Sequence, residues 1–202
     1  MRVTLFDYGA GNLHSLAKAL ETPGVTLAIE ADPAAATATD LLVLPGVGAF
    51  GPAAAALAST RDRMRDAIAG GLPCVGICLG MQLRFDRSEE GDGLGLGGIP
   101  GIVRRLRTRR QPHMGWNTIE PQGEQPLLAA SGLRTAYFAH SFVCDPDDPA
   151  AIAAWTRHDD DRFASFVRAG SALGVQFHPE KSSAAGVALL RAVVATARAG
   201  VA

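Results

Sequence analysis

The feature of this sequence that most constrains its fold is an apolar run, Pro73 to Gln82, which contains a cysteine between two glycines. The run predicts a buried strand, a sharp turn and a helix start, with Cys78 at the turn and Gly76 and Gly80 on either side. Glycines at these places let a strand and a helix approach closely around a strained residue, as in the Gly-x-Ser-x-Gly nucleophile elbow. At a helix N-terminus, unpaired N–H groups and the helix dipole would stabilise a thiolate. Cys78 is therefore a candidate nucleophile.

A second cysteine provides a comparison within the same run. Cys74 has no flanking glycines, and we expect it in the hydrophobic core. A buried structural role for Cys78 stays open on this motif alone, because an elbow needs its catalytic partners.

The rest of the chain predicts an α/β fold of three layers, with a mostly parallel central sheet, flanking helices and a strand-rich second half. Apolar segments without polar alternation are typical of strands covered on both faces; they lie at Val3–Phe6, Val25–Ile29 and Leu41–Leu44. Helical spacing is found in residues 13–20, from about 52 to 70, and from about 183 onward. Short strand-like segments between turn residues fill the second half: Ile102–Leu106, Trp116–Ile119, Thr135–Val143, Ile152–Thr156, Phe163–Val167 and Leu173–Phe177. At 202 residues, we expect one domain over residues 1–202.

Composition excludes several classes of partner. Lys and Arg number 19 against 20 for Asp and Glu, a formal charge of −1, which offers no argument for nucleic acid or membrane binding. Three cysteines without Cys-x-x-Cys spacing argue against a disulfide framework or a zinc site and fit a reducing cytoplasm. We find no signal peptide or membrane span and expect a cytoplasmic protein. For the arginine run at 104, 105, 107, 109 and 110, we favour a solvated strand face over an anion-binding patch.

A base and an orienting acid for the cysteine stand at the end of the last expected strand. His178 and Glu180 are two residues apart, so they can share one side of an extended chain. His178 would take the thiol proton and return it to a leaving amine, while Glu180 would hold the ring tautomer. A lone histidine is usually structural, but the glutamate and the elbow favour catalysis. The order Cys, His, Glu differs from the order in α/β-hydrolases, which counts against that fold.

Backbone amides could stabilise the negative charge that develops on the substrate oxygen during the reaction. The N–H of Leu79, just past the elbow, is one oxyanion donor, and Val47 and Gly48 in the glycine loop after the third strand offer a second. Such a loop could instead bind phosphate, but no Walker or Gly-x-Gly-x-x-Gly pattern accompanies it.

Together these motifs make the chain resemble the class I glutamine amidotransferases, and specifically the glutaminase subunits of imidazole glycerol phosphate synthases in histidine biosynthesis. The resemblance runs nearly end to end, through residues 7–12, 45–50, 76–82, 88–91, 112–117, 140–142 and 177–182. The elbow and His-Pro-Glu identify only the class, whereas the first block and His113–Asn117 are specific. Gln111 departs from the family, which more often has an apolar residue there.

The resemblance implies glutamine hydrolysis through a γ-glutamyl thioester on Cys78, without metal or organic cofactor, and delivery of ammonia to a separate (β/α)₈-barrel cyclase in a heterodimer. The cyclase would form imidazole glycerol phosphate and AICAR. The implied glutamine-binding residues are Gly46, Gly48, Gln82, His140, Ser141 and Phe142. Asn12, Met114 and Trp116 would face the cyclase, although residue type alone fits core packing of Met114 and Trp116 nearly as well. Neither Tyr137 nor His140 has an assignable proton-transfer role.

Two other functions remain open. The chain could be a glutaminase subunit of another amidotransferase, although the His113–Asn117 block argues against this. It could also be a non-catalytic scaffold of the same fold, although Cys78, His178 and Glu180 are all present.

Overall fold

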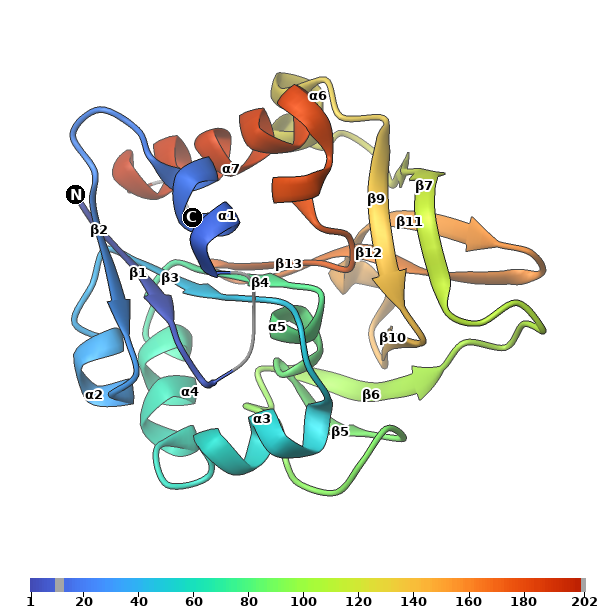
Figure 1. The fold of residues 1–202 in the computed structure, drawn as a ribbon, viewed down its shortest axis with the longest axis horizontal. Coiled ribbons are helices and arrows are strands. Elements are labelled where there is room, and N and C mark those ends of the chain that lie inside the picture. The colour runs from blue at the N-terminus through green and yellow to red at the C-terminus, as the bar shows by residue number, and fades with distance from the viewer. Residues whose placement is uncertain (10–12, 201–202) are drawn as a thin grey trace.

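The computed structural model describes residues 1–9 and 13–200, which form a central sheet between two layers of helices (Figure 1). The sheet has eight strands in the order β2-β1-β3-β4-β13-β12-β11-β8. In chain order these are β1 Arg2–Phe6, β2 Thr26–Glu30, β3 Leu41–Leu44, β4 Cys74–Ile77, β8 Glu120–Pro121, β11 Ile152–His158, β12 Asp161–Ala169 and β13 Ala172–Val175. Pairing from β2 to β13 is parallel, and pairing from β13 to β8 is antiparallel. The prediction of a mostly parallel sheet is therefore confirmed.

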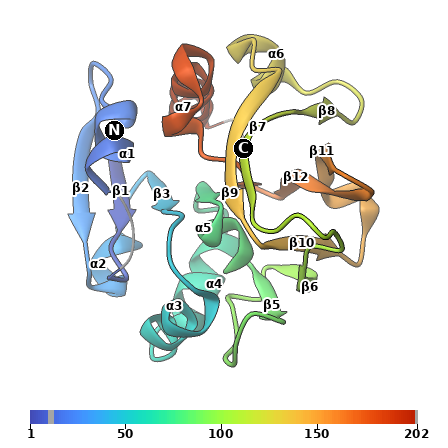
Figure 2. The same cartoon turned by 45° about the vertical axis from the view of Figure 1, so that its right-hand side comes forward.

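Two helical layers cover the sheet because its strands are apolar on both sides. Leu41 and Val43 belong to one buried cluster, and Leu42 and Leu44 belong to the other. The first cluster lies under α1 Leu13–Leu20, α6 Pro126–Ser131 and α7 Ser183–Arg198. The second lies under α2 Pro33–Ala36, α3 Phe50–Leu57, α4 Arg61–Ala69 and α5 Leu79–Gln82. Figures 1 and 2 show the two sets of helices on opposite sides of the sheet.

The helix expected up to about residue 70 is two helices, α3 and α4. Thr60 donates its N–H and its hydroxyl to the carbonyl of Leu57, at 3.0 and 3.3 Å. These local bonds compete with continuation of the helix. The inward-facing residues of the two helices include Leu57, Met64 and Ile68, which are all buried.

Two small sheets extend the central one in the second half. One has the order β10-β6-β5, and the other pairs β7 with β9. Their bounds are β5 Phe85–Ser88, β6 Ile99–Arg105, β7 His113–Thr118, β9 Thr135–His140 and β10 Phe142–Pro146. The single strand predicted over Thr135–Val143 is wrong: the chain changes sheets at Ser141, whose carbonyl accepts the N–H of Leu106 at 2.9 Å. Burial continues on both sides of the break, so the apolar pattern did not reveal it.

The parallel strands place three segments at one edge of the sheet. β3, β4 and β13 are neighbours, and their registers align Leu44 with Gly76 and Ile77 with Val175. Because these strands run in the same direction, the residues that follow them meet at their carboxyl ends. The glycine loop, the Cys78 turn and the segment leading to His178 therefore lie together.

No helix in the described part of the chain is long and apolar enough to span a membrane.

Candidate active site

Cys78 occupies the sharp turn between β4 and α5, as the elbow pattern predicts. Its backbone has φ 49° and ψ −103°, a conformation that residues with a side chain rarely adopt. A Cβ on Gly76 would lie 2.4 Å from the carbonyl oxygen of Gly80, and a Cβ on Gly80 would lie 2.0 Å from that of Leu44. Only glycine allows these contacts, which hold β4, α5 and β3 against one another. The turn leaves Cys78 only 5% exposed, at the first turn of α5.

His178 and Glu180 form a buried pair beside the elbow. The His178 Nδ1 and Glu180 Oε1 atoms are 2.9 Å apart, and both side chains are buried. The backbone around His178 is fixed, because its N–H donates to the carbonyl of Tyr137 at 2.9 Å and its carbonyl accepts the Ser182 hydroxyl at 2.6 Å. An ionised Glu180 requires the proton on Nδ1, which leaves Nε2 to exchange a proton with the thiol.

The electrostatics of this pair favour a charged ring. Burial alone would lower the pKa of His178, but hydrogen bonds and charge interactions with Cys78 and Glu180 outweigh it and raise the pKa to about 9. Gln176 adds a donor to the sulfur, since its Nε2 lies 3.5 Å from Cys78 Sγ. The site can therefore hold a thiolate beside an imidazolium at neutral pH.

A cavity of about 330 Å³ opens in front of the cysteine and brings most of the predicted site residues together. Its walls include Cys78, His178, the predicted oxyanion residues Val47, Gly48 and Leu79, and the predicted glutamine-binding residues Gly46, Gln82, His140, Ser141 and Phe142. Glu180 does not line the cavity, and its carboxylate contacts His178 at Nδ1.

The glycine loop is anchored at its start and adaptable beyond it. The buried Tyr8 hydroxyl donates to the Pro45 carbonyl, and burial raises the pKa of this phenol well above its usual range. Gly48 has φ 122°, which favours glycine, and is exposed to solvent. Leu79 begins α5, so its N–H has no acceptor within the helix. The two predicted oxyanion donors therefore differ, with one fixed by the elbow and one on an adaptable loop.

Buried amides and neutral histidines hold the part of the cavity wall formed by Gln82, His140 and Phe142. Gln82 Nε2 donates to the Phe142 carbonyl at 3.0 Å and to Gln176 Oε1 at 3.4 Å. His140 Nδ1 lies 3.1 Å from the same Phe142 carbonyl, so it carries the proton, and its Nε2 accepts from His113 Nδ1 at 3.1 Å. Asn117 Nδ2 completes the chain at 3.1 Å from His113 Nε2. Each ring thus donates through one nitrogen and accepts through the other.

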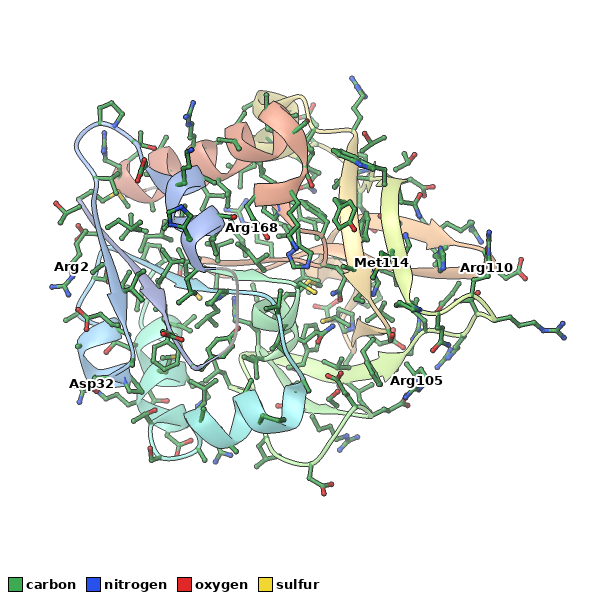
Figure 3. The ribbon with its side chains drawn as sticks, in the orientation of Figure 1. Arg2, Asp32, Arg105, Arg110, Met114 and Arg168 are labelled. Carbon is green, nitrogen blue, oxygen red and sulfur yellow. The ribbon has the colours of Figure 1, made fainter. Side chains whose placement is uncertain are left out.

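Two of the three residues expected at the partner surface, Met114 and Trp116, lie on β7. Met114 is 65% exposed and Trp116 is 56% exposed, so the core-packing alternative is wrong for both. His113 and Asn117 point inward from the same strand. Figure 3 labels Met114 on β7, beside the sheet that carries Arg105. Asn12 lies outside the described residues.

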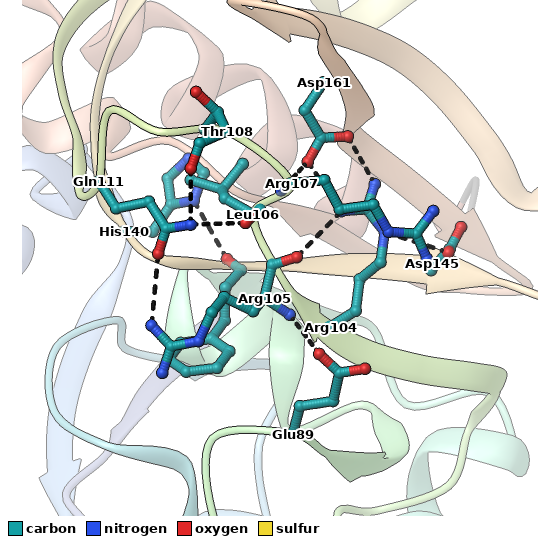
Figure 4. A network of polar contacts seen from close by, with 11 residues as sticks. Glu89, Arg104, Arg105, Leu106, Arg107, Thr108, Gln111, His140, Asp145 and Asp161 are labelled. Carbon is teal, nitrogen blue, oxygen red and sulfur yellow. Dashed lines mark hydrogen bonds and ion pairs between the residues drawn. The ribbon is translucent and has the colours of Figure 1, made fainter.

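The preference for a solvated face is wrong for one member of the arginine run. Arg104 is 5% exposed and binds Asp161 through two nitrogens, at 2.8 and 2.9 Å, and Asp145 at 3.2 Å (Figure 4). Gln111, the departure from the family pattern, donates to the carbonyls of Leu106 and Thr108 at 2.6 and 3.0 Å. These contacts hold the turn before β7.

The cavity wall also contains three charged residues that were not predicted as part of the site: Glu90, Arg105 and Lys181. Glu90 is positioned by Phe50, whose N–H donates to Oε2 at 2.9 Å, and the Arg105 guanidinium lies 4.7 Å from the Phe142 ring centre. The acidic loop and the arginine run were the available signals. The sequence alone did not show that the two meet at the elbow.

Comparison with known proteins extends over almost the whole chain. A family model described as "Glutamine amidotransferase class-I" matches residues 4–195. The imidazole glycerol phosphate synthase subunit HisH of Gloeothece citriformis is 44% identical over 196 residues, covering 93% of this chain and 92% of that protein. The subunit of the same name from Corynebacterium diphtheriae is 42% identical over 202 residues, covering 94% and 96%.

Solved structures share the fold at much lower identity. A glutamine amidotransferase crystal structure has a TM-score of 0.74 at 19% identity, covering 97% of this chain and 98% of that one. PurLQS from Thermotoga maritima has a TM-score of 0.74 at 18% identity, covering 96% and 97%. The predicted fold class is therefore confirmed.

Proposed function

The chain belongs to the class I glutamine amidotransferases, and we propose that it hydrolyses glutamine as the glutaminase subunit of an imidazole glycerol phosphate synthase. The observation that carries the proposal is the assembly of Cys78, His178 and Glu180 at one cavity, with His178 held 2.9 Å from the carboxylate. Similarity to HisH subunits over nearly the whole chain supports the assignment to histidine biosynthesis.

The chemistry begins with the Cys78 thiolate, which attacks the side-chain amide carbon of glutamine. The developing oxyanion accepts the N–H of Leu79 and one from the Val47–Gly48 segment. The His178 imidazolium donates its Nε2 proton to the leaving nitrogen, so ammonia departs and a thioester remains. His178 then takes a proton from water, the hydroxide attacks the thioester, and glutamate leaves as the thiolate re-forms.

The charged walls of the cavity suit the other end of glutamine. Glu90 can accept from its α-ammonium group, and Arg105 can bind its α-carboxylate through a charge-assisted hydrogen bond. Gln82 and the backbone at Ser141 and Phe142 would hold the chain between these charges and Cys78.

The partner is a (β/α)₈-barrel cyclase that receives the ammonia in a heterodimer. Met114 and Trp116 support this, because together they expose a large apolar surface on one strand beside the cavity. Exposed apolar side chains of this size commonly mark protein interfaces. The cytoplasmic location expected from the sequence stays a prediction.

The test combines labelling with reconstitution. The chain is treated with a glutamine-mimicking electrophile and mapped by peptide mass spectrometry, then mixed with the cyclase and assayed for glutamate release. We expect label on Cys78, a stable complex and faster glutamate release with the cyclase and its ligand. Absence of label on Cys78 would favour a non-catalytic scaffold. A chain that is labelled but neither binds the cyclase nor responds to it would favour a glutaminase subunit of a different synthase.

A further inference from the structure

Arg84 is a buried cation that lies outside the Cys78 site. This residue lies between α5 and β5 and is only 2% exposed. Its Nε and Nη1 atoms are enclosed and have no hydrogen-bond partner among the described residues. Arg104, by contrast, has nearly the same burial but binds two carboxylates. Arg84 therefore has no comparable acceptor within the described chain.

Cys74 is the ionisable group that influences the pKa of Arg84, but its thiol does not provide a negative charge to pair with the guanidinium. Burial lowers the pKa of the guanidinium, and the Cys74 thiol partly opposes this effect. Burial also raises the pKa of Cys74 to about 11, so the thiol is neutral at physiological pH. An isolated buried cation is unfavourable, and an anion bound at the open part of the guanidinium would compensate its charge.

Arg84 lies on the wall of a cavity of about 320 Å³ with a mixed lining. The walls come from α4, the segment before β5 and its following loop, and the turn between β12 and β13. Arg65 and Ser171 contribute a second guanidinium and a hydroxyl, while Ile68 and Leu96 are apolar. A Cβ on Gly98 would lie 3.2 Å from Arg84 Nη2 and 3.6 Å from Nε, so the glycine leaves the guanidinium uncovered on that side.

We propose that this cavity binds a phosphate group, free or carried by a small metabolite, with Arg84 as the buried anchor. Two guanidinium groups and the Ser171 hydroxyl, which now donates to the Leu72 carbonyl at 3.3 Å, come from three separate segments. Donors spread in this way suit a tetrahedral group, whereas a planar carboxylate can be held by one guanidinium. Arg65 now pairs with Asp62 at 2.9 Å and Asp66 at 3.2 Å. Both carboxylates are largely exposed, and exposed pairs are weak, so Arg65 can turn toward a ligand.

The phosphate cavity is separate from the glutamine cavity. Ser171 precedes β13 and accepts the N–H of Cys74 at the start of β4, whereas Cys78 follows the end of β4. Four residues of strand separate these ends by roughly 13 Å. A ligand here would contact neither Cys78 nor His178.

The test is calorimetric titration and thermal unfolding of the full chain with inorganic phosphate, glycerol phosphate or acetate, at an ionic strength held constant with chloride. Arg84→Met keeps the volume and removes the charge, and Arg87→Met, at an exposed position outside the cavity, is the matched control. We expect saturable phosphate binding and a rise in Tm for the wild type and for Arg87→Met. Arg84→Met should bind phosphate about 10- to 100-fold more weakly. Without phosphate its Tm should equal or exceed that of the wild type, because a buried unpaired charge is gone.

Each outcome tests the proposal or shows whether the ligand is free phosphate or a phosphorylated metabolite. Tighter binding of glycerol phosphate than of phosphate would indicate a phosphorylated metabolite, and the reverse would indicate the free ion. A wild type that does not respond, a response equal in Arg84→Met (an adventitious ion only), or acetate as effective as phosphate would overturn it. If Arg84→Met fails to fold, Gly98→Leu retains the arginine and fills the space beside it, and an unchanged phosphate response there would equally overturn the proposal.

Discussion

Two groups of buried residues built around histidine lie at or next to the cavity in front of Cys78, and their charges differ: a charged side around His178 and a neutral side around His113 and His140. On one side, His178 contacts Glu180 and Cys78, and its pKa is raised to about 9. On the other, His113 and His140 contact each other, and burial together with neighbouring histidines lowers the pKa of His113 to about 4 and that of His140 well below its usual value. Burial disfavours the charged ring in all three. The comparison shows that the hydrogen-bond partner decides which ring carries a proton at neutral pH.

The difference matches the roles proposed for the two groups. A ring that transfers protons must be able to hold one, and His178 has acidic neighbours that stabilise the charged form. A ring that only orients a carbonyl works better without charge, because a neutral ring donates from one nitrogen and accepts at the other. His140 does so toward Phe142 and His113.

We expect the largest effect from removing the proposed nucleophile, Cys78, on the charged side. Cys78→Ala should abolish glutamate release, because no other thiol lies at the elbow, and should lower the pKa of His178 by removing a partner. Cys74→Ser is the control and should retain most of the activity, with some loss of stability from a buried hydroxyl. Glutamate release and NMR titration of His178 measure the two effects. An active Cys78→Ala protein would overturn the assignment of the nucleophile.

The next test separates the base from the acid that orients it. His178→Ala should lower kcat by about 10²- to 10⁴-fold, since it removes proton transfer. Glu180→Gln should cost less, because the ring remains and only its orientation and charge stabilisation weaken. Steady-state kinetics with saturating glutamine compare the two. A larger loss in Glu180→Gln would show that these roles are assigned the wrong way round.

A smaller effect is expected on the neutral side. His140→Phe removes the donor to Phe142 and the acceptor of His113, so the wall that holds Gln82 should loosen. We expect KM for glutamine to rise by about tenfold, with kcat changing far less than in His178→Ala. If kcat falls as far as in His178→Ala while KM stays constant, His140 takes part in the chemistry and the contrast between the two sides fails.

The smallest expected effect is on the pH dependence of stability, to which His178 and His113 should contribute with opposite slopes. The pKa of His178 is raised in the folded state, so its contribution is complete below pH 6.5 and is lost as pH rises from 6.5 to about 9. The pKa of His113 is lowered, so its contribution is complete above pH 6.5 and is lost as pH falls from 6.5 to about 4. Tm measured across pH should fall less on the alkaline side in Glu180→Gln and less on the acid side in His113→Gln. Identical profiles in all three proteins would contradict these shifts.

The sequence was most informative where chemistry allows few residue types. A nucleophile elbow needs Gly76, Cys78 and Gly80 at fixed spacing, and His178 with Glu180 needs only local geometry. The apolar strands of the sheet were equally clear, because burial on both faces leaves no polar alternation.

Contacts between distant segments could not be predicted in this way. Arg104 looked solvated because its partner Asp161 is 57 residues away. His113 and His140 meet only because β7 pairs with β9, and an apolar pattern does not specify which strands pair. The change of sheet at Ser141 was hidden for the same reason.

The conformation of Cys78 has a consequence for how this protein can evolve. Holding a residue with a side chain at φ 49° costs on the order of 1–3 kcal/mol, and glycine would relieve much of that strain. Selection for thermostability alone would therefore favour loss of the thiol, whereas selection for turnover retains it. The elbow is a point where stability and activity trade off directly, and a thermostable form of this chain has to gain its stability elsewhere.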